Sequence, residues 1–307
     1  NKQFDASLIK DVQAKWIPYD FKNQNIDDFL ENLDIDKTVE ISSIQGGYSN
    51  AIKQLNKFIE VGYQDYAKYR SDPSKEASSQ LSPYFHSGQI STHEVFDKIS
   101  ELESWSPESI NPKMVGRREG WWGSTENFES FMDELITWRE LGYHTCVRRA
   151  NYNQYSSLPE WAIKTLHEHS SDEREHIYSL DELTYSQTHD EIWNAAQNQL
   201  RTQGVIQNYL RMLWGKKILE WTPNPQIALS YMITLNDRYS LDGRDPNSYS
   251  GVFWILGRYD RAWGPERSIF GKIRYMTSDS TARKFNLKPY LEKWGNESLG
   301  VSTSISK

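Results

Sequence analysis

The chain has 307 residues, enough for one large domain or two modest ones with a sizeable core. Hydrophobic residues make up 37% and charged residues 25%, the ordinary balance of a globular protein, whereas 12 Trp, 18 Tyr and 11 Phe are an unusual share of rings. The single cysteine, Cys146, excludes an internal disulfide and a cysteine-built metal site, and no apolar run is long enough to span a membrane. The net charge of −7 gives no overall attraction for nucleic acid, so any such binding must use a local basic face.

The amino-terminal part differs from the rest of the chain. Residues 1–45 are polar and weakly periodic, which predicts a linker with room for a short helix. From Gly46 onward the pattern is helical, because Ile52, Leu55 and Phe58 recur at three- and four-residue steps. The expected division is therefore a linker over 1–45 and a helical domain over 46–307.

Four later segments carry the start signal of a helix, a Ser or Thr followed three residues later by Glu. These pairs are Ser91 and Glu94, Ser157 and Glu160, Ser179 and Glu182, and Thr188 and Glu191. Residues 204–221 are predicted as a strong helix, and residues 222–225 (TPNP) end it and begin the next one. Alternating strand patterns are scarce, so the predicted fold class is all-α, with no doubly wound sheet.

The sequence lacks the motifs of several common enzyme and nucleotide-binding families. It has no G-x-G-x-x-G after a strand, no Walker loop, no G-x-S-x-G and no H-E-x-x-H. His167 and His169 lie in a stretch full of charge, which favours a solvated helix end over a metal site. We therefore expect no metal.

Four segments, in this order, resemble the photolyase and cryptochrome family over roughly residues 46–287. They are 66–73 (YAKYRSDP) with 78–84 (SSQLSPY) and 88–91 (GQIS); 134–141 (ELITWREL); 188–197 (THDEIWNAAQ) with 210–221 (LRMLWGKKILEW); and 235–247 (LNDRYSLDGRDPN) with 270–276 (FGKIRYM). The last two resemble the class II enzymes that repair cyclobutane pyrimidine dimers, although Gln199, Leu200 and 206–208 (IQN) are more similar to class I. The resemblance implies the helical FAD-binding domain of the family. The family's amino-terminal α/β antenna domain is expected to be largely absent, because residues 1–45 have room only for its tail, and an antenna chromophore is doubtful.

The resemblance implies one FAD per monomer. The implied contacts are Tyr66, Ser78, Ser79, Leu81, Ser82, Arg139, Arg211, Asn236 and Asp242. Independently of the family, serine hydroxyls before a helix suit a diphosphate, although they could equally serve only to cap and turn. Arg211 lies on an otherwise apolar helix face, where a buried guanidinium needs a carboxylate partner, and the resemblance makes Asp242 the candidate; the alternative is a surface arginine. By resemblance, Asn236 faces the flavin N5, which favours repair over light sensing.

The resemblance also implies a pocket for the damaged bases. Glu134 and Trp138 are four residues apart and so share one helix face, where Glu134 would hydrogen-bond the pyrimidine dimer and Trp138 would pack against it. Met212 and Trp254 match the other walls. An isolated pair at this spacing would more often be a surface carboxylate beside a core ring.

Three tryptophans match the chain that passes electrons to the flavin in class II. Trp214 and Trp221 lie seven residues apart, two helical turns, and are expected to line one stripe, while Trp193 precedes them on the previous helix. Trp214 is expected as the inner or middle relay and Trp221 as the outer one. Each could alternatively be core.

The implied activity is that of a deoxyribodipyrimidine photo-lyase, a carbon–carbon lyase in which light drives electron transfer from reduced FAD to a dimer flipped out of damaged double-stranded DNA. The alternatives are a cryptochrome-like blue-light sensor and a flavoprotein without repair activity. The residues expected to face DNA phosphates are Arg148, Arg149, Arg258, Arg261, Arg283 and Lys284. We expect a cytoplasmic monomer, nuclear if the source is eukaryotic, that binds no membrane.

Overall fold

A computed structural model describes residues 6–16, 25–117 and 119–296. The chain separates into two units, Asn1–Val39 and Glu40–Lys307. The division falls a few residues before Gly46, where the helical pattern was expected to begin. Parts of the predicted linker, 1–5 and 17–24, lie outside the described residues.

The first unit contains two short helices, α1 (Ala6–Lys15) and α2 (Ile26–Glu31). The Asn25 side chain caps the start of α2 by accepting a hydrogen bond from the Asp27 amide. This segment thus holds more helix than the sequence indicated.

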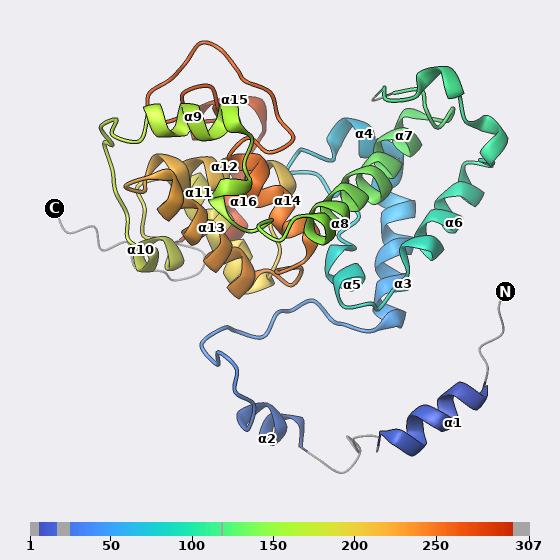
Figure 1. Ribbon diagram of the computed structural model, residues 1–307. Coiled ribbons are helices and arrows are strands. Elements are labelled where there is room, and N and C mark those ends of the chain that lie inside the picture. The colour runs from blue at the N-terminus through green and yellow to red at the C-terminus, as the bar shows by residue number, and fades with distance from the viewer. Residues whose placement is uncertain (1–5, 17–24, 118, 297–307) are drawn as a thin grey trace. The chain divides into compact units, whose positions relative to one another are not determined.

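The second unit is built from helices (Figure 1). Its amino-terminal helices are α3 (Tyr48–Lys57), α4 (Tyr66–Tyr69), α5 (Ser82–His86), α6 (Thr92–Leu102), α7 (Glu126–Met132) and α8 (Arg139–Arg148). Its later helices are α9 (Glu160–Glu168), α10 (Leu180–Thr184), α11 (Glu191–Gln203), α12 (Asn208–Glu220), α13 (Pro225–Tyr239), α14 (Pro246–Ile255), α15 (Ser278–Lys284) and α16 (Lys288–Trp294). Within the described ranges no strand forms, apart from an isolated bridge between Arg267 and Gly271. The all-α prediction is confirmed.

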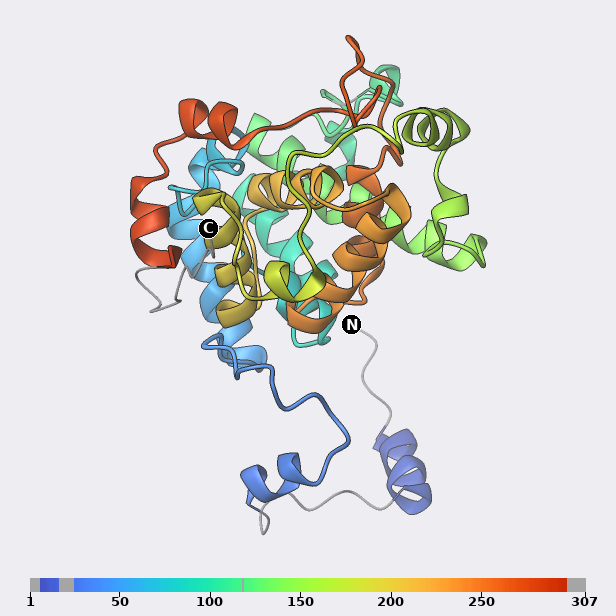
Figure 2. The same ribbon diagram turned by 90° about the vertical axis from the view of Figure 1, so that its left-hand side faces the viewer.

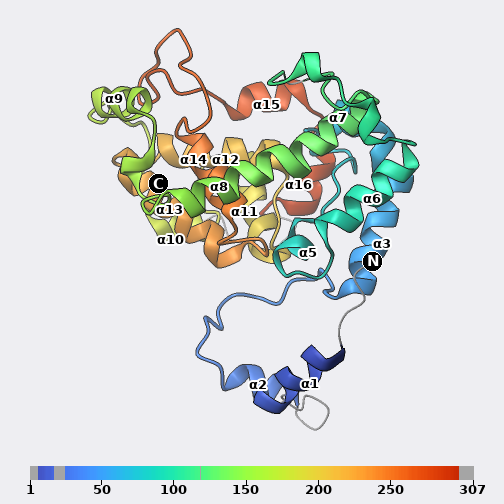
Figure 3. The same cartoon turned by 45° about the vertical axis from the view of Figure 1, so that its right-hand side comes forward.

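Close helix contacts occur where the sequence supplies glycine. α8 packs along α14, and α14 packs on α12 and α13, so α8, α14 and α12 lie side by side (Figure 3). A Cβ at Gly142 of α8 would lie 2.9 Å from the Ser250 hydroxyl of α14, and one at Gly215 of α12 would lie 2.1 Å from Ile255 Cδ1. Both glycines therefore allow backbones to approach where a side chain would separate the helices. The packed helices α12, α13 and α14 run from yellow to orange in Figure 2.

Helix starts and ends are partly those predicted. The Ser179–Glu182 capping box is present, Ser91 caps α6 through the His93 amide, and Asn224 with Pro225 begins α13. Gly204, in the left-handed conformation, ends α11, so the predicted 204–221 helix begins only at Asn208.

Two predicted starts are wrong. Asp190, not Thr188, caps α11, because the Thr188 hydroxyl donates instead to Asn194 Oδ1 at 2.8 Å. Pro159, not Ser157, precedes α9, and the Ser157 hydroxyl donates to the Gln154 carbonyl at 2.6 Å.

A π-helical segment, Asp133–Trp138, joins α7 to α8. It carries both Glu134 and Trp138, the pair singled out in the sequence. π-Helical turns inside longer helices are frequent at functional sites, because the extra residue per turn re-aims side chains. In the part of the chain that the structure describes, no helix is both long and apolar enough to cross a bilayer.

Candidate functional site

The first turn of α12, the last turn of α13 and the turn that follows α13 bring three of the predicted residues together. Arg211 Nη1 donates to Asn236 Oδ1 at 2.5 Å, and Arg211 Nη2 lies 3.8 Å from Asp242 Oδ1. The Arg211 and Asp242 side chains are only 17% and 19% exposed, and Asn236 is almost fully buried. The predicted pairing of Arg211 with Asp242 is confirmed, and Arg211 also holds the amide of Asn236.

Two hydroxyls complete the surroundings of Asp242. Ser240, which the sequence analysis did not single out, donates to the Asp242 carboxylate, and Ser82 also bonds to it. Burial alone would raise the pKa of Asp242, but the Arg211 charge and these hydroxyls hold it below its ordinary value. The cluster therefore keeps one cation and one anion side by side in a sheltered place.

The other predicted serines lie on the loop that leads to α5. Ser78 and Ser79 are half-buried, and within the described ranges no hydrogen bond of their hydroxyls is found. The Leu81 side chain is fully buried in the core formed by α3, α6 and α7, so any contact of this residue with a ligand must use its main chain. The loop thus offers two hydroxyls close in sequence to Ser82.

Glu134 is held by an arginine that the sequence analysis left unassigned. Arg70, just after α4, donates to the Glu134 carboxylate, and its guanidinium lies 5.8 Å from the centre of the Tyr66 ring. The Gln207 side chain in turn donates to the Arg70 carbonyl at 2.8 Å, which fixes the loop. Burial and the nearby Glu134 charge raise the pKa of Tyr66 well above its ordinary value, so its phenol stays protonated.

Two of the predicted pocket walls are in direct contact. The rings of Trp138 and Trp254 lie 4.5 Å apart between centres, tilted by 50°, and the Trp138 indole donates to Asp133 at 3.0 Å. Both rings remain partly exposed. Met212 is half-buried on α12 beside Arg211, and its place in the pocket stays a prediction. Large planar surfaces that are partly open suit stacking against another planar group.

Arg139 is engaged on its own helix. Its guanidinium contacts Glu140 at 2.6 Å and lies 4.4 Å from the centre of the Tyr143 ring. Its predicted contact with a cofactor stays a prediction, and that contact would have to share the guanidinium with these neighbours.

The three predicted relay tryptophans are buried and connected. Trp193 and Trp221 meet edge to face with ring centres 5.7 Å apart, and the Trp193 indole donates to the Trp214 carbonyl at 2.9 Å. The Trp214 indole donates to Gln197 Oε1 at 2.8 Å. The connection therefore runs through Trp193, from the other helix, rather than along one stripe of α12 as the seven-residue spacing suggested.

The basic residues predicted to face DNA divide into two groups. Arg148, Arg149, Arg261, Arg283 and Lys284 are exposed. Arg258 is only 3% exposed; it donates to the Tyr152 carbonyl at 2.7 Å and to the Ser157 hydroxyl, and it lies over the Phe253 ring. The structure contradicts its assignment as a phosphate contact, because its guanidinium is used inside the fold to anchor the loop before α9. Burial lowers the pKa of Arg258 to about 10.

The histidines of the charged stretch have ordinary partners. His169 Nδ1 lies 2.7 Å from Asp172, which also accepts from the Ile269 amide at 2.8 Å. Over the residues that the structure describes, no group of three or more His, Cys, Asp or Glu is placed to hold a metal ion.

These observations define an all-helical domain that holds a sheltered Arg–Asn–Asp cluster, an open pair of tryptophans and a buried tryptophan series. No protein-family model matches the chain. A deoxyribodipyrimidine photo-lyase of Methanothermobacter thermautotrophicus is 40% identical over 267 residues, covering 87% of this chain and 55% of that protein. One of Potorous tridactylus is 38% identical over 263 residues, covering 85% of this chain and 46% of the relative.

Solved structures agree on the fold. A class III photolyase from Agrobacterium tumefaciens superposes with a TM-score of 0.61 at 16% identity, over 88% of this chain and 50% of that one. A cryptochrome from Synechocystis gives 0.59 at 14% identity, over 84% and 47%. These sequence relatives support membership of the photolyase/cryptochrome family, and the solved structures share the helical fold of this chain. It spans about half the length of the curated relatives it matches.

Proposed function

We propose that this chain binds FAD and repairs cyclobutane pyrimidine dimers in DNA under light. The observation that carries the proposal is the joint placement of the Arg211–Asn236–Asp242 cluster and the Trp138–Trp254 pair in one helical unit whose relatives are named photo-lyases. The resemblance of its last two motifs favours class II. By analogy with the family, the protein acts as a monomer, in the cytoplasm or, in a eukaryotic source, the nucleus.

The residues present fit a flavin. Arg211 supplies a cation, Asp242 an anion and Asn236 an amide that can donate or accept, and all three are largely sheltered from water. These are the groups that can hold the polar edge of an otherwise flat, apolar ring system, while the Ser78 and Ser79 hydroxyls can serve a diphosphate. Bound and fully reduced, the flavin would supply a photoexcited electron to the dimer.

The pocket residues would position the lesion. Trp138 and Trp254 offer open ring faces against which two flipped pyrimidines can pack, as extrusion from the duplex requires. Glu134 would hydrogen-bond the dimer, with Arg70 keeping its carboxylate oriented. Exclusion of water by the bound lesion would strengthen this bond.

The tryptophans would conduct electrons inward. We order them as Trp221, then Trp193, then Trp214, because the Trp193 ring meets the Trp221 ring and the Trp193 indole donates to the Trp214 carbonyl. This order supports Trp214 as the inner relay. The exposed residues Arg148, Arg149, Arg261, Arg283 and Lys284 would contact phosphates.

The alternative is a light sensor with the same flavin and tryptophans but no lesion pocket in use. The test is binding in the dark. The FAD-loaded chain should bind a duplex with one pyrimidine dimer at least tenfold more tightly than the undamaged duplex, and Trp254→Ala should remove that preference. Equal affinity of the wild type for both duplexes would contradict the repair proposal and favour the sensor.

A further inference from the structure

The buried tryptophan series has almost no exposed surface. Trp214 and Trp221 are each only 2% exposed and Trp193 is fully buried, and of the three only Trp221 forms part of a cavity wall. A more exposed ring next to Trp221 would give an electron from solution an easier way into the series. The neighbours of Trp221 identify the candidates.

Tyr178 is one of two rings that continue the series outward. Its ring meets Trp221 edge to face with centres 5.5 Å apart, a spacing similar to that between Trp221 and Trp193. The Tyr178 amide also donates to the Trp221 carbonyl at 3.0 Å, which holds the two residues in register. Tyr178 is half-buried and lies just before α10, outside the family's three matched tryptophans.

The other ring, His189, is a base for the Tyr178 phenol. Tyr178 Oη lies 2.7 Å from His189 Nδ1, and the His189 amide donates back to the same oxygen at 3.1 Å. Partial burial and the adjacent His176 lower the pKa of His189 below its ordinary value, so its imidazole is mostly neutral at pH 7 and can accept a proton. The other charged groups that act on it are Asp190, Lys217 and Glu175.

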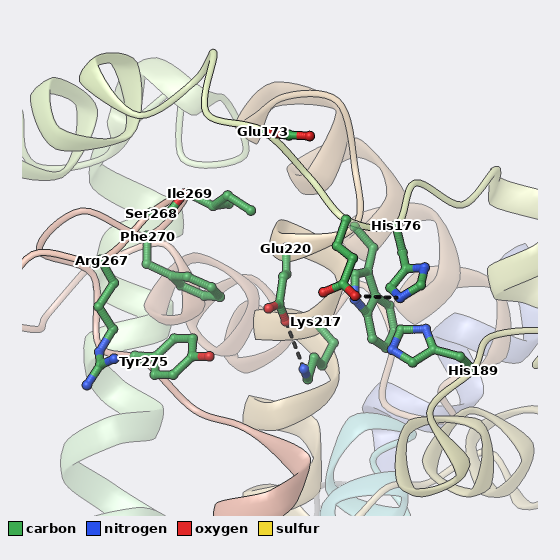
Figure 4. Close-up of a pocket in the computed structure, with 12 residues that line it drawn as sticks. Glu173, His176, His189, Lys217, Glu220, Arg267, Ser268, Ile269, Phe270 and Tyr275 are labelled. Carbon is green, nitrogen blue, oxygen red and sulfur yellow. Dashed lines mark hydrogen bonds and ion pairs between the residues drawn. The ribbon is translucent and has the colours of Figure 1, made fainter.

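His189 also opens to solvent. It lines, with His176, one side of a cavity of about 420 Å³, where Lys217 and Glu220 form an ion pair at 2.8 Å (Figure 4). Arg267, Phe270 and Tyr275 form the opposite side. A proton received by His189 can therefore leave to water through this cavity.

We propose that Tyr178 is the terminal electron relay of this protein and His189 its proton acceptor. This inference rests on the proposed function, because light-driven electron transfer inward is what leaves Trp221 as a radical cation. Tyr178 gives one electron to Trp221, which returns to the neutral indole, and the phenolic O–H bond of Tyr178 breaks as its proton passes to His189 Nδ1. The products are a neutral tyrosyl radical and a protonated imidazole. A one-electron reductant in solution, such as a thiol, then restores the phenol with a proton.

A base in contact with a phenol makes the phenol easier to oxidise, because a phenol that has lost an electron is a strong acid. Without a base in contact, the electron transfer would leave a high-energy cation, whereas transfer of the proton over 2.7 Å gives a neutral radical. The His189 amide remains as a donor to the radical oxygen.

The experiment is electron paramagnetic resonance of the FAD-loaded chain, frozen after blue illumination without reductant. Ring-deuterated tyrosine identifies the radical. The wild type should give a tyrosyl signal that is lost in Tyr178→Phe and kept in the matched control Tyr185→Phe, a residue that is 48% exposed. His189→Gln keeps a bonding partner but removes the base, and should slow the growth of the tyrosyl signal about a hundredfold, the low end for loss of a general base.

A measurement in the dark, independent of the flavin, accompanies it. The ¹⁵N resonance of His189 Nδ1 should shift in Tyr178→Phe as its hydrogen bond is lost, and an unchanged resonance would overturn the proposed proton acceptor. A wild type that photoreduces its flavin but yields only a tryptophanyl radical would overturn the relay and leave the proposed function standing. A wild type that binds no flavin would overturn both.

Discussion

Removal of the Arg211 guanidinium is the perturbation whose magnitude the structure defines best. Arg211→Ala leaves the Asp242 carboxylate, only 19% exposed, without its cation, and leaves the buried Asn236 oxygen without its donor at 2.5 Å. Breaking a fully buried ion pair costs about 3–5 kcal/mol. Because the two charged groups are 3.8 Å apart and retain some exposure, the cost of breaking the ion pair lies at the low end of this range. Loss of the hydrogen bond to the Asn236 side chain adds about 1 kcal/mol.

The expected loss is therefore about 3–4 kcal/mol in the free energy of unfolding, or roughly 6–10 °C in Tm for a unit of this size. Bound flavin, measured as the ratio of flavin to protein absorbance, should fall below a tenth of the wild-type value. Arg238→Ala, an exposed arginine on the adjacent helix α13, is the matched control and should keep both properties.

A double-mutant cycle isolates the pairing itself. Adding Asp242→Asn to Arg211→Ala removes the uncompensated charge, so the double variant should be less destabilised than the sum of the two single changes by at least about 1 kcal/mol. Strict additivity of the two changes, or full flavin occupancy in Arg211→Ala, would refute the reasoning.

Further outcomes follow from other contacts. The depressed pKa of Asp242 makes its stabilisation present above about pH 4 and lost as the pH falls further, so the destabilisation caused by Asp242→Asn should shrink in acid unfolding curves; a pH-independent effect would contradict this. Trp214→Phe should abolish light-driven reduction of bound flavin by a thiol, as followed by flavin absorbance, while Trp161→Phe on α9 should not. A wild-type rate of reduction in Trp214→Phe would mean that Trp214 only fills the core. Arg261→Ala should lower the slope of log affinity against log salt by about 1 and weaken damaged and undamaged DNA alike. Glu134→Ala should weaken only dimer-containing DNA, roughly tenfold, as expected for loss of one hydrogen bond to a charged group; equal weakening of both duplexes would remove Glu134 from the lesion pocket.

The sequence predicted the contact between Arg211 and Asp242 from two sources. An arginine on an apolar helix face requires an anion, and the family resemblance gave Asp242 as that anion. The partner of Glu134 could not be identified in this way. Arg70 lies 64 residues earlier, just after the short helix α4, where nothing local distinguishes it from a solvated arginine.

The predicted role of Arg258 as a phosphate contact was wrong for the opposite reason. A cation near Trp254 was expected at the surface, yet its neighbours are the Tyr152 carbonyl and the Ser157 hydroxyl, more than a hundred residues earlier. Tertiary hydrogen bonds to main-chain carbonyls leave no sequence pattern. The start of α11 was ambiguous locally, because Thr188 and Asp190 are both good capping residues and only the contact with Asn194 decides between them.

Light-dependent repair of a defined DNA lesion is the activity that the proposed function requires of this chain. A duplex oligonucleotide with a single thymine dimer is incubated with the FAD-loaded, chemically reduced protein, in blue light and in darkness, and restored thymines are quantified by chromatography. Many turnovers per protein are expected in light and none in darkness, with Trp254→Ala strongly impaired. Absence of repair in light by protein that carries stoichiometric reduced FAD and binds the damaged duplex would contradict the proposed function.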